Sequence, residues 1–522
     1  MVFRNERTWL NAVEAGAEDE FHRRFDAAIA RVPKEFGATH PMYIAGEPVR
    51  SRRGTFADTC PANPSLVLGR FQRGTRADAR RAVEAAKAAF PAWSRTPYAE
   101  RARMHERAAD LVAERKYDLA ALMSFENGKN RLEAMADVDE AADLIRWYAD
   151  EMVVNRGFER AMGMYTADEH ATSVLRPYGV WAVIAPFNFP LAIAAGMSCG
   201  ALVTGNTVVF KPASDTPFMG LKLYEALRDA GLPNGVLNYV TGPGSTVGQE
   251  LVEHPGVDGF VFTGSRDVGL RAYRRFGRDG PRPIIAEMGG KNPTIVTATA
   301  DLDAAAKGVA RAAFGYGGQK CSACSRVLVD RRVKSAFIEK LVGEARGIRI
   351  GDPWARDVSL GPLISVAAVR TYSEAVQRVR KSKGRILTGG GTPKRPGNFV
   401  EPTIVDRLPR DHPTNTEELF VPILSVVEVD GIEDAIRVAN DVDYGLTAGI
   451  FSRDVDEIRR FFEDVHAGVT YANRSAGATT GAIVGVQPFG GWKMSGISGK
   501  AAGGHYYLQQ FLREQSRTTY GP

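Results

Sequence analysis

The sequence predicts an α/β fold, and three observations support this prediction. Strand-like and helix-like segments alternate from residue 179 to about residue 276. A second alternating region follows, from about residue 284 to residue 472. Glycine-rich turns follow several of the strand-like segments, as expected where parallel strands end next to helix N-termini. The first region therefore predicts a parallel sheet with helices on both faces, and the second region predicts a second α/β lobe.

The N-terminal part is predicted to be mostly helical. Its helices are expected over residues 18–32, 76–91, 99–124 and 130–155. The first has the spacing of an amphipathic helix, and Pro91 is expected to stop the second. Between them, a strand is expected over residues 43–49, followed by turn-rich sequence as far as Pro64.

The first alternating region contains four expected strands. They cover residues 179–185, 206–210, 236–240 and 259–263, with helices at 190–204 and 216–230. Gly231 follows the second of these helices at the usual position of a C-terminal glycine. Ligands of such sheets bind at the carboxyl ends of the strands. The turns after these strands are therefore candidate binding loops.

The second alternating region places strands near the segments IIAEM, RVLVD, ILSVVEV and GIFS, with helices between them. The C-terminal tail then contains VQPFGGWKMSG and HYYLQQFLREQSRTTY. This tail mixes bulky apolar and charged residues like an exposed strand, which needs a partner edge to cover it.

Composition and charge exclude several classes of protein. The chain has 522 residues and a net charge of +6, and its basic clusters are too short for a nucleic-acid surface. The charge-free run 177–210 is broken by prolines, glycines and asparagines into strand, loop, helix and strand, so no membrane span is expected. Four cysteines indicate a reducing compartment, not a disulfide framework. With no signal-peptide pattern at the N-terminus, a cytoplasmic location is expected.

Three strand ends carry residues suited to a dinucleotide. Gly242–Gly248 (GPGSTVG) follows a strand and opens a helix, so its backbone N–H groups and the helix dipole can face an anion. By itself this motif is one residue off the common fingerprint, and a plain glycine-rich turn is the alternative. Phe262–Ser265 (FTGS) repeats the arrangement with Ser265 as an N-cap. Lys211, in KPAS, is placed to hold ribose hydroxyls. The convergence of these three strand ends favours a nucleotide.

The stretch GYGGQKCSACS, residues 315–325, contains two cysteines and allows four interpretations: a metal site, a redox disulfide, a catalytic thiol or core packing. Zinc needs four ligands, and no second matched pair of Cys or His is present, so no metal is expected. A redox C-x-x-C belongs to a small redox fold. Cys321 is therefore the candidate nucleophile, at a helix start whose positive potential lowers its pKa. Cys324 is expected to face the core.

A thiol nucleophile works with a base and an oxyanion donor. Glu287, in AEMGGKN, is a carboxylate at a strand end and the candidate base, with a surface or salt-bridged Glu as the alternative. Asn188, in PFNFP, is an amide in an apolar loop that must find hydrogen-bond partners. Its NH₂ group can face an oxyanion, with an Asn that caps its own turn as the alternative.

Taken together, the motifs PFNFP, KPAS, FTGS, EMGGKN, GQKCSACS, EELFVP and QPFGGWKMSG resemble those of the aldehyde dehydrogenase superfamily, in order and over nearly the whole chain. The resemblance implies the aldehyde dehydrogenase fold. This fold has three parts. They are a Rossmann-like cofactor domain (1–156 and 176–286), an α/β catalytic domain (287–472) and a small β oligomerisation element (157–175 and 473–522). The hairpin-like segment and the C-terminal strand imply domain exchange in a homodimer or a higher homo-oligomer.

The resemblance also implies a mechanism. Cys321 attacks an aldehyde to give a thiohemiacetal, whose oxyanion is held by the Asn188 side chain and the Cys321 backbone N–H. Hydride passes to the nicotinamide, a thioester remains, and Glu287 activates the water that releases the acid. Glu418 and Phe420, in EELFVP, place the nicotinamide ribose and ring. The cofactor-binding residues implied are Ala185, Pro186, Lys211, Ser214, Gly244, Gly248, Thr263, Gly264, Ser265, Glu418 and Phe420.

Within the superfamily, the chain shows further features of the L-glutamate γ-semialdehyde (1-pyrroline-5-carboxylate) dehydrogenases. These features are a serine after the nucleophile, the stretch TGAIVG at 480–485, an N-terminal extension and the ending LQQFLREQSRT. The resemblance implies oxidation of L-glutamate γ-semialdehyde to L-glutamate in proline catabolism, and leaves room for a separate proline dehydrogenase as a partner. The substrate-binding residues it implies are Ser322, Gly481 and Ala482 for the carboxylate, Phe189 and Phe489 for the aliphatic part, and Glu133 in support.

Ser214 departs from the KPAE sequence of many NAD-preferring relatives. A glutamate there would bind the ribose 2′-hydroxyl and repel a 2′-phosphate, so NAD is expected and NADP stays open. Two other functions also stay open. One is oxidation of another carboxylated or aromatic semialdehyde, and the other is a scaffold without activity, which the intact Cys321, Glu287 and Asn188 argue against.

Overall fold

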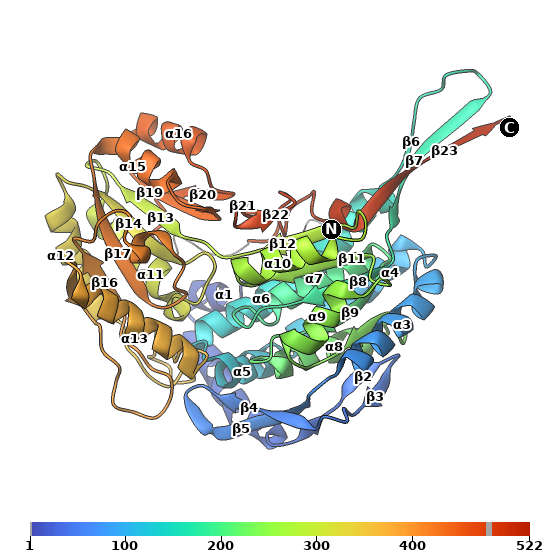
Figure 1. Ribbon diagram of the computed structural model, residues 1–522, viewed down its shortest axis with the longest axis horizontal. Coiled ribbons are helices and arrows are strands. Elements are labelled where there is room, and N and C mark those ends of the chain that lie inside the picture. The colour runs from blue at the N-terminus through green and yellow to red at the C-terminus, as the bar shows by residue number, and fades with distance from the viewer. Residues whose placement is uncertain (1–2, 477–482, 522) are drawn as a thin grey trace.

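The computed structural model describes residues 3–476 and 483–521, which form two α/β lobes and a projecting β-sheet. In Figure 1 the first lobe is blue and green, the second is yellow and orange, and the projecting sheet lies at the upper right. None of the helices in the described residues combines the length and the apolar character that a membrane span requires.

The first lobe is built on an eight-stranded sheet with the order β22-β12-β11-β8-β9-β10-β2-β3. Its five central strands are parallel: β12 (Ile284–Glu287), β11 (Gly259–Thr263), β8 (Val180–Ile184), β9 (Thr207–Lys211) and β10 (Leu237–Tyr239). The outer strands are antiparallel: β22 (Gly496–Ile497), β2 (Met42–Ile44) and β3 (Glu47–Val49). The parallel sheet is thus confirmed at its centre. The strand IIAEM, expected in the second region, belongs to this sheet as β12.

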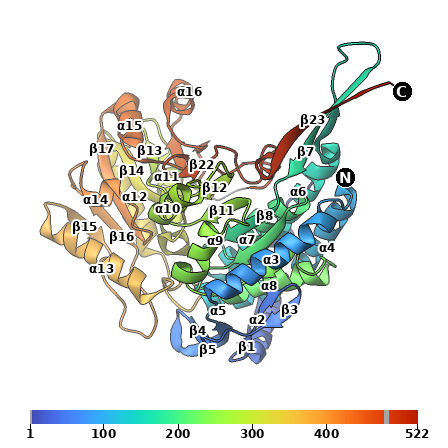
Figure 2. The ribbon, with the colours of Figure 1, turned by 45° about the vertical axis from the view of Figure 1, so that its right-hand side comes forward.

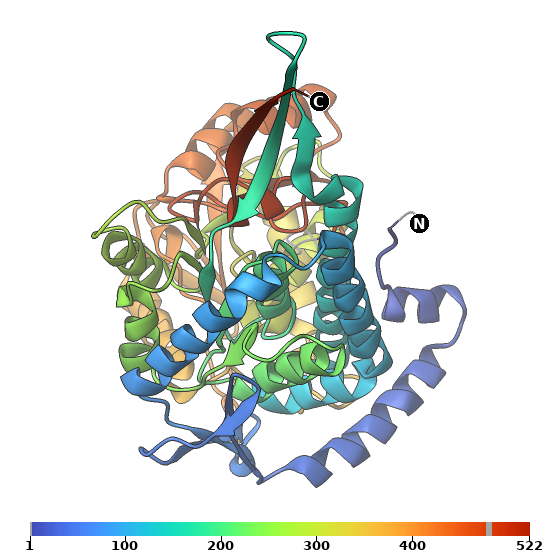
Figure 3. The same cartoon turned by 90° about the vertical axis from the view of Figure 1, so that its right-hand side faces the viewer.

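Thirteen helical segments belong to the first lobe in the described residues. They are α1 (Thr8–Glu14), α2 (Glu18–Arg31), η1 (Val32–Glu35), α3 (Arg76–Trp93), α4 (Tyr98–Glu114), α5 (Lys116–Asn127), α6 (Arg131–Val154), η2 (Arg156–Phe158), α7 (Ala192–Val203), α8 (Pro217–Asp229), η3 (Gly244–Gly248), α9 (Gln249–Glu253) and α10 (Arg266–Phe276). Figure 3 shows the dark blue α1 and α2 along the outside of the lobe.

Two helix boundaries differ from the predictions. Pro91 does not stop α3, which continues to Trp93. The last turn is held because the Trp93 ring is buried and its Nε1–H donates to the Leu202 carbonyl at 3.1 Å. The helix expected over residues 99–124 is two helices, because the backbone at Arg115 leaves the helical conformation between α4 and α5.

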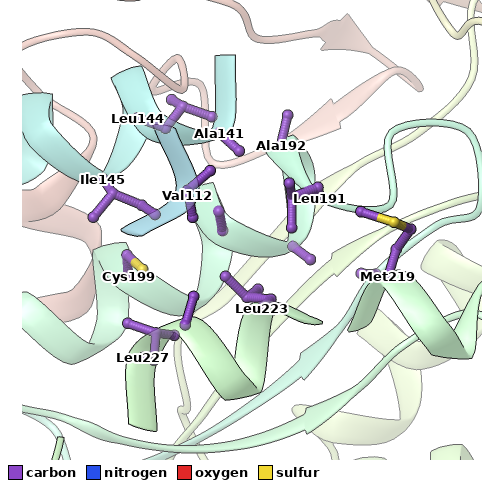
Figure 4. Close-up of a cluster of buried hydrophobic side chains, with 14 of the residues drawn as sticks. Val112, Ala141, Leu144, Ile145, Leu191, Ala192, Cys199, Met219, Leu223 and Leu227 are labelled. Atoms are coloured by element: carbon purple, nitrogen blue, oxygen red, sulfur yellow. The ribbon is translucent and has the colours of Figure 1, made fainter. Parts of the chain in front are cut away.

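The core of the first lobe lies between α4, α6, α7 and α8, where the side chains in Figure 4 gather. Val112, Ile145 and Leu223 from three of these helices are almost fully buried. Cys199, on α7, lies among them with no exposed surface, and burial raises the pKa of its thiol. This cysteine is therefore part of the packing and is unavailable to a metal or a substrate.

The region expected to be turn-rich before Pro64 forms a β-hairpin. Strands β4 (Thr55–Cys60) and β5 (Asn63–Gln72) pair antiparallel, and β1 (Thr39–His40) adds a third strand in parallel with β5. The prediction missed this sheet because its turn-forming residues obscure the apolar alternation, although Cys60, Leu68 and Phe71 are fully buried.

The second lobe is built on a seven-stranded sheet with the order β15-β16-β17-β14-β13-β19-β20, parallel except at β15. Its strands are β13 (Asn292–Val296), β14 (Cys324–Asp330), β15 (Arg385–Thr388), β16 (Thr403–Asp406), β17 (Ile423–Val429), β19 (Thr447–Phe451) and β20 (Val469–Ala472). Its helices are α11 (Leu302–Phe314), η4 (Gly315–Gly318), α12 (Lys334–Arg346), α13 (Val366–Lys381), α14 (Pro413–Thr416), α15 (Gly431–Asn440) and α16 (Val455–Asp464).

The projecting sheet joins the chain end to a distant hairpin. Strand β23 (Leu512–Tyr520) pairs antiparallel with β7 (Glu169–Pro177), which also pairs with β6 (Glu159–Ala161). The partner edge expected for the tail is thus supplied by this same chain. Figure 2 shows β7 and β23 extending together away from the first lobe. The remaining short elements are η5 (Leu508–Phe511), β18 (Tyr444–Gly445) and β21 (Trp492–Lys493), the last two paired with each other.

Candidate active site

A cavity lined by both lobes brings several of the predicted site residues together. From the first lobe come residues of α6, the β8–α7 loop, α7, β11 and β12, and from the second comes the loop between η4 and β14. Among the lining residues are Glu140, Phe189, Thr263, Glu287, Cys321, Ser322, Phe489 and Tyr507. The predicted nucleophile and the predicted base therefore face one space, beside the serine and both phenylalanines expected to bind substrate.

Cys321 lies in the loop between η4 and β14, and no helix begins at this residue. The prediction of a lowered thiol pKa is wrong for the same reason. Burial, together with the carboxylates of Glu418 and Glu287, raises the pKa of Cys321 to about 12, although the nearby N–H groups of Cys321 and Ser322 act in the opposite direction. In the free protein the sulfur is therefore a thiol at neutral pH, and its reaction requires a means of removing the proton.

Cys324 is a core residue, as expected, but it lies on a strand and not on a helix. It is the first residue of β14 and is 1% exposed. The Thr294 hydroxyl donates to its Sγ at 3.2 Å, and burial raises the pKa of its thiol to about 11. The two cysteines thus have separate environments and do not form a pair.

Glu287 is the last residue of β12, at the carboxyl end of the first sheet. The Gly491 N–H donates to its Oε2 at 3.0 Å. Burial nevertheless raises the pKa of Glu287 to about 8, because this one hydrogen bond does not replace the lost hydration of a carboxylate. A carboxyl group with this pKa can take up and release a proton near neutral pH, as a general base must.

Glu140, which the sequence analysis did not identify, lines the same cavity. Burial, reinforced by the neighbouring Asp137, raises the pKa of Glu140 to about 8. The residue predicted to support the site, Glu133, lies seven residues earlier on α6 and does not line the cavity. Two helical turns separate these glutamates and place them on one face of the helix. The sequence pattern could therefore have indicated either glutamate as a site residue. Only the position of α6 in the structure shows that Glu140 is the one that reaches the cavity.

Glu133 instead contacts the loop that carries the nucleophile. The Tyr316 N–H donates to Glu133 Oε2 at 3.1 Å, and the Lys320 ammonium lies 2.9 Å from Oε1. Glu133 therefore does not contact the cavity itself, and it is placed to support the site through the loop that carries Cys321.

Asn188 lies in the loop between β8 and α7, directly before the cavity residue Phe189. Its side chain is 3% exposed and makes no hydrogen bond to any residue within 3–476 and 483–521. An Asn that caps its own turn is therefore not what the described structure contains. Asn188 is not among the residues that line the cavity. A buried amide without a partner is a donor that remains available to a ligand.

The predicted dinucleotide residues lie at the carboxyl ends of adjacent strands. Strands β11, β8, β9 and β10 are neighbours, so Thr263, Lys211 and the turn at Gly242–Gly248 meet at one edge. A side chain at Gly248 would contact the Lys211 side chain at 3.9 Å, whereas one at Gly244 would meet nothing within 4 Å. The edge therefore offers open space in front of a helical turn, which fits a pyrophosphate.

Other predicted cofactor residues border this edge. Burial lowers the pKa of Lys211 to about 8, and its Nζ donates to the Pro212 carbonyl at 2.9 Å. Ser265 occupies the N-cap position of α10 but makes no capping hydrogen bond, so its exposed hydroxyl stays available. Ser214 is exposed. Three further predicted residues lie in the adjoining turns: Ala185, whose N–H donates to the Lys211 carbonyl, Pro186, which follows it, and Gly264, whose N–H donates to the Glu287 carbonyl.

Glu418 and Phe420 approach this region from the second lobe. The Gly290 N–H donates to Glu418 Oε1 at 2.9 Å, and burial raises the pKa of Glu418 to about 7. Phe420 has a left-handed backbone (φ 58°), and its ring packs edge-on against Phe187 with 5.9 Å between ring centroids. Both residues line a small pocket next to the nucleophile loop, together with Lys320 and Ala323. The predicted carboxylate-binding residues Gly481 and Ala482 lie outside the described residues.

Comparisons with known proteins extend this picture. A sequence profile described as "Aldehyde dehydrogenase family" matches residues 49–516. A 1-pyrroline-5-carboxylate dehydrogenase of Geobacillus sp. (strain WCH70) is 38% identical over 509 residues, covering 95% of each chain. The protein of that name from Bacillus mycoides (strain KBAB4) is 38% identical over 503 residues, again covering 95% of each.

Solved structures give the same similarity. A 1-pyrroline-5-carboxylate dehydrogenase from Thermus with bound NAD superposes with a TM-score of 0.94 at 38% identity, covering 100% of this chain and 99% of that one. Proline utilization A (PutA) from Bdellovibrio bacteriovorus superposes with a TM-score of 0.93 at 34% identity, over 99% of this chain but only 53% of its own. The similarity to PutA thus covers about half of that longer protein.

Proposed function

Because the chain belongs to the aldehyde dehydrogenase family, we propose that it oxidises L-glutamate γ-semialdehyde, the open form of 1-pyrroline-5-carboxylate, to L-glutamate. Family membership confirms the predicted fold and the predicted class of enzyme, an NAD(P)-dependent aldehyde dehydrogenase. The observation that carries the proposal is the single cavity shared by Cys321, Glu287 and Ser322.

The residues that line the cavity, together with the neighbouring Asn188, suit the steps of aldehyde oxidation. The Cys321 thiol loses its proton to solvent water as its sulfur adds to the aldehyde carbon, and the resulting oxyanion is stabilised by the Asn188 NH₂ group and the Cys321 backbone N–H. Bound NAD or NADP supplies the acceptor for the hydride. Glu287 then removes a proton from the water that attacks the thioester, releasing the acid and restoring the thiol. The raised pKa of Glu287 supports this assignment, because a base with a pKa near the working pH both accepts and returns its proton readily.

The apolar walls and the polar groups of the cavity support a short amino-acid aldehyde as substrate. Phe189 and Phe489 lie on the cavity wall and suit the aliphatic carbons. Ser322 is 1% exposed and suits one end of a carboxylate. Glu140 is a partly buried carboxyl group on the cavity wall that forms no ion pair within the described residues, and we assign the α-ammonium of the substrate to it. A hydrogen bond to a charged group is worth about 1.5–3 kcal/mol, so the loss of one lowers kcat/KM about 10- to 150-fold.

The proposal is tested with a panel of aldehydes. Oxidation of L-glutamate γ-semialdehyde, another carboxylated semialdehyde, an aromatic aldehyde and propanal is measured with NAD and with NADP. We expect Cys321→Ala to abolish all activity, and Ser322→Ala to lower kcat/KM selectively for the carboxylated substrates. Comparable rates on propanal and L-glutamate γ-semialdehyde would overturn the substrate assignment, and a preference for another panel member would replace it.

We also propose a homodimer or larger homo-oligomer that forms through the projecting sheet. The tip of the β6–β7 hairpin exposes Met162, Met164 and Tyr165, with 56%, 66% and 93% of their surfaces accessible. Apolar side chains this exposed on a projecting hairpin suit burial against a second copy. Sedimentation of the wild type and of a Met164→Lys/Tyr165→Lys variant tests this, since a wild-type monomer contradicts it.

The domain boundaries, the cellular location and a partner enzyme are also proposed. The domain boundaries at residues 156, 175, 286 and 472 stay as proposed from the sequence, as does a cytoplasmic location, with all four cysteines unpaired. A separate proline dehydrogenase is proposed as the source of the substrate, because PutA joins a region similar to this chain to a second region of its own.

A further inference from the structure

The loop that carries Cys321 begins with an unusual backbone. Tyr316, Gly317 and Gly318 all have left-handed conformations, with φ of 48°, 62° and 67°. Glycine adopts this conformation freely, but for a residue such as tyrosine it costs roughly 1–2 kcal/mol. Strain of this kind persists only where surrounding contacts fix it, and it is concentrated at functional sites. The contacts that hold Tyr316 therefore identify what sets the path of the loop.

Glu133 makes two of the contacts that hold this loop. Its Oε2 accepts the Tyr316 N–H at 3.1 Å, and its Oε1 lies 2.9 Å from the Lys320 ammonium, the residue directly before Cys321. Gly315 leaves room for this pair, because a Cβ there would lie 3.1 Å from Glu133 Oε1 and 3.2 Å from Lys320 Nζ. One carboxylate thus holds both ends of the segment that leads to the nucleophile.

Residues of both lobes form contacts with this loop. Asn292, on β13 of the second lobe, donates to the Cys321 carbonyl at 2.7 Å and to the Ala323 carbonyl at 2.9 Å. The loop belongs to that same lobe. Glu133 lies on α6 of the first lobe, which also supplies Glu287 and Phe189 to the cavity. Its contacts therefore cross between the lobes and relate the position of the nucleophile to that of the base.

We propose that Glu133 is a positioning residue that fixes the nucleophile loop of the second lobe against the first lobe. Binding of Tyr316 and Lys320 by one carboxylate sets the distance between the Cys321 sulfur and the groups it works with. The proposal rests on Cys321 as the nucleophile of the proposed function. A misplacement of about 1 Å in such an arrangement lowers the rate about 100-fold.

The alternative is an ion pair that contributes only to stability. A matched control for this alternative exists on α8, where Lys222 and Glu225 lie 3.3 Å apart with side chains 21% and 25% exposed. The Lys320 and Glu133 side chains are 20% and 19% exposed. Glu225→Gln therefore removes an ion pair of similar burial away from the cavity, and we expect it to leave kcat unchanged.

The experiment compares Glu133→Leu, Glu133→Gln and Lys320→Met with that control. The readouts are kcat, the KM values for the aldehyde and for NAD, and the rate at which Cys321 reacts with 4,4′-dithiodipyridine, a probe that needs neither aldehyde nor cofactor. We expect Glu133→Leu to lower kcat about 10- to 100-fold with little change in KM for NAD, and to change the thiol reaction rate. Glu133→Gln keeps an acceptor for the Tyr316 N–H and should recover most of kcat.

Two results would overturn the proposal: a folded Glu133→Leu enzyme with kcat within twofold of wild type, or equal losses for Glu133→Gln and Glu133→Leu. Should Glu133→Leu fail to fold, a double-mutant cycle in kcat between Glu133→Gln and Lys320→Met decides. Non-additive effects on kcat support the proposal that Glu133 positions the loop through Lys320, and additive effects reject it. A wild type inactive on L-glutamate γ-semialdehyde would refute the proposed function alone, because the thiol reaction tests the position of Cys321 independently.

Discussion

We predict that Cys321 of the free enzyme reacts slowly with disulfides, because its thiol is rarely ionised. Burial and two nearby carboxylates raise the pKa of its thiol from an ordinary value near 9 to about 12. At pH 9, where both carboxylates are charged, the thiolate fraction then falls roughly 500-fold, from about one half to about one molecule in 10³. The nucleophilicity of a thiolate rises with its pKa, with a Brønsted coefficient of about 0.4–0.5, which recovers roughly 15- to 30-fold. The net prediction at pH 9 is a disulfide exchange roughly 15- to 30-fold slower than that of an unperturbed thiol.

The pH dependence of the reaction rate distinguishes the effect of the Glu287 charge on the thiol pKa from the effect of burial. With its pKa raised to about 8, Glu287 is neutral at pH 6 and charged at pH 9. Its charge disfavours the thiolate only above pH 8, so the wild-type rate should rise tenfold per pH unit at first and then flatten. Glu287→Gln removes that charge. We therefore expect it to match the wild type at pH 6 and to react faster than the wild type at pH 9.

The assay follows the release of thiopyridone from 4,4′-dithiodipyridine between pH 6 and pH 9, with Cys321→Ala as the blank. The other three cysteines are at most 1% exposed and should not contribute. A wild-type rate that levels off below pH 8 would show that the thiol pKa is low after all. A Glu287→Gln enzyme slower than wild type at pH 9 would show that Glu287 acts as the base for the thiol in the free enzyme. Either result refutes the electrostatic reasoning.

Three further predictions concern other parts of the site. Asn188→Ala should lower kcat/KM about 100- to 1000-fold through loss of an oxyanion donor, while the urea midpoint changes little because the amide has no hydrogen-bond partner in the described part of the chain. Gly289→Ala should weaken NAD binding measured by titration, because a Cβ there would lie 1.9 Å from Glu418 Oε2. Lys129→Met should destabilise the fold by about 3–5 kcal/mol in urea unfolding, because it leaves Asp137, its partner at 2.7 Å, as an unpaired buried charge.

Each of these predictions has its own control. Asn188→Asp keeps the shape of the side chain without its donor, so activity near the wild-type level would contradict the oxyanion role. Gly343→Ala introduces the same methyl group on α12 with nothing within 4 Å, and equal NAD binding in both glycine variants would contradict the predicted clash. Adding Asp137→Asn to Lys129→Met should recover part of the lost stability, and a double variant less stable than the single one would be unexpected.

The sequence predicted those parts of the fold and site that depend on local patterns. The strand ends at Lys211, Thr263 and Glu287 could be placed because each ends a short apolar run followed by a turn. Parallel strands bring such ends to one edge, so their convergence needed no coordinates. The second lobe was recognised for the same reason, although the position of β12 was wrong because alternation along the chain does not show which sheet a strand joins.

The features of the fold and site that were not predicted depend on contacts between segments that are distant in the sequence. Glu133 and Glu140 are equivalent in any helical pattern, and only the angle at which α6 passes the cavity distinguishes them. The pKa of Cys321 depends on carboxylates 34 residues before it in the chain, at Glu287, and 97 residues after it, at Glu418. The hairpin of β4 and β5 was missed because turn-forming residues hide its alternation, and its burial comes from packing against α5 and not from its own pattern.

The acids of the cavity suggest one more consequence, a proton balance on binding. With its pKa raised to about 8, Glu140 is protonated in roughly nine of ten molecules at pH 7. A ligand that places an ammonium group beside it favours the carboxylate, so binding should release close to one proton per site at pH 7 and almost none at pH 9. L-Glutamate, the proposed product, serves as the ligand, and a pH indicator in weak buffer measures the release. Glu140→Gln should abolish the release while leaving the ligand bound, and binding of L-glutamate without any proton release at pH 7 would contradict the assignment of the ammonium to Glu140.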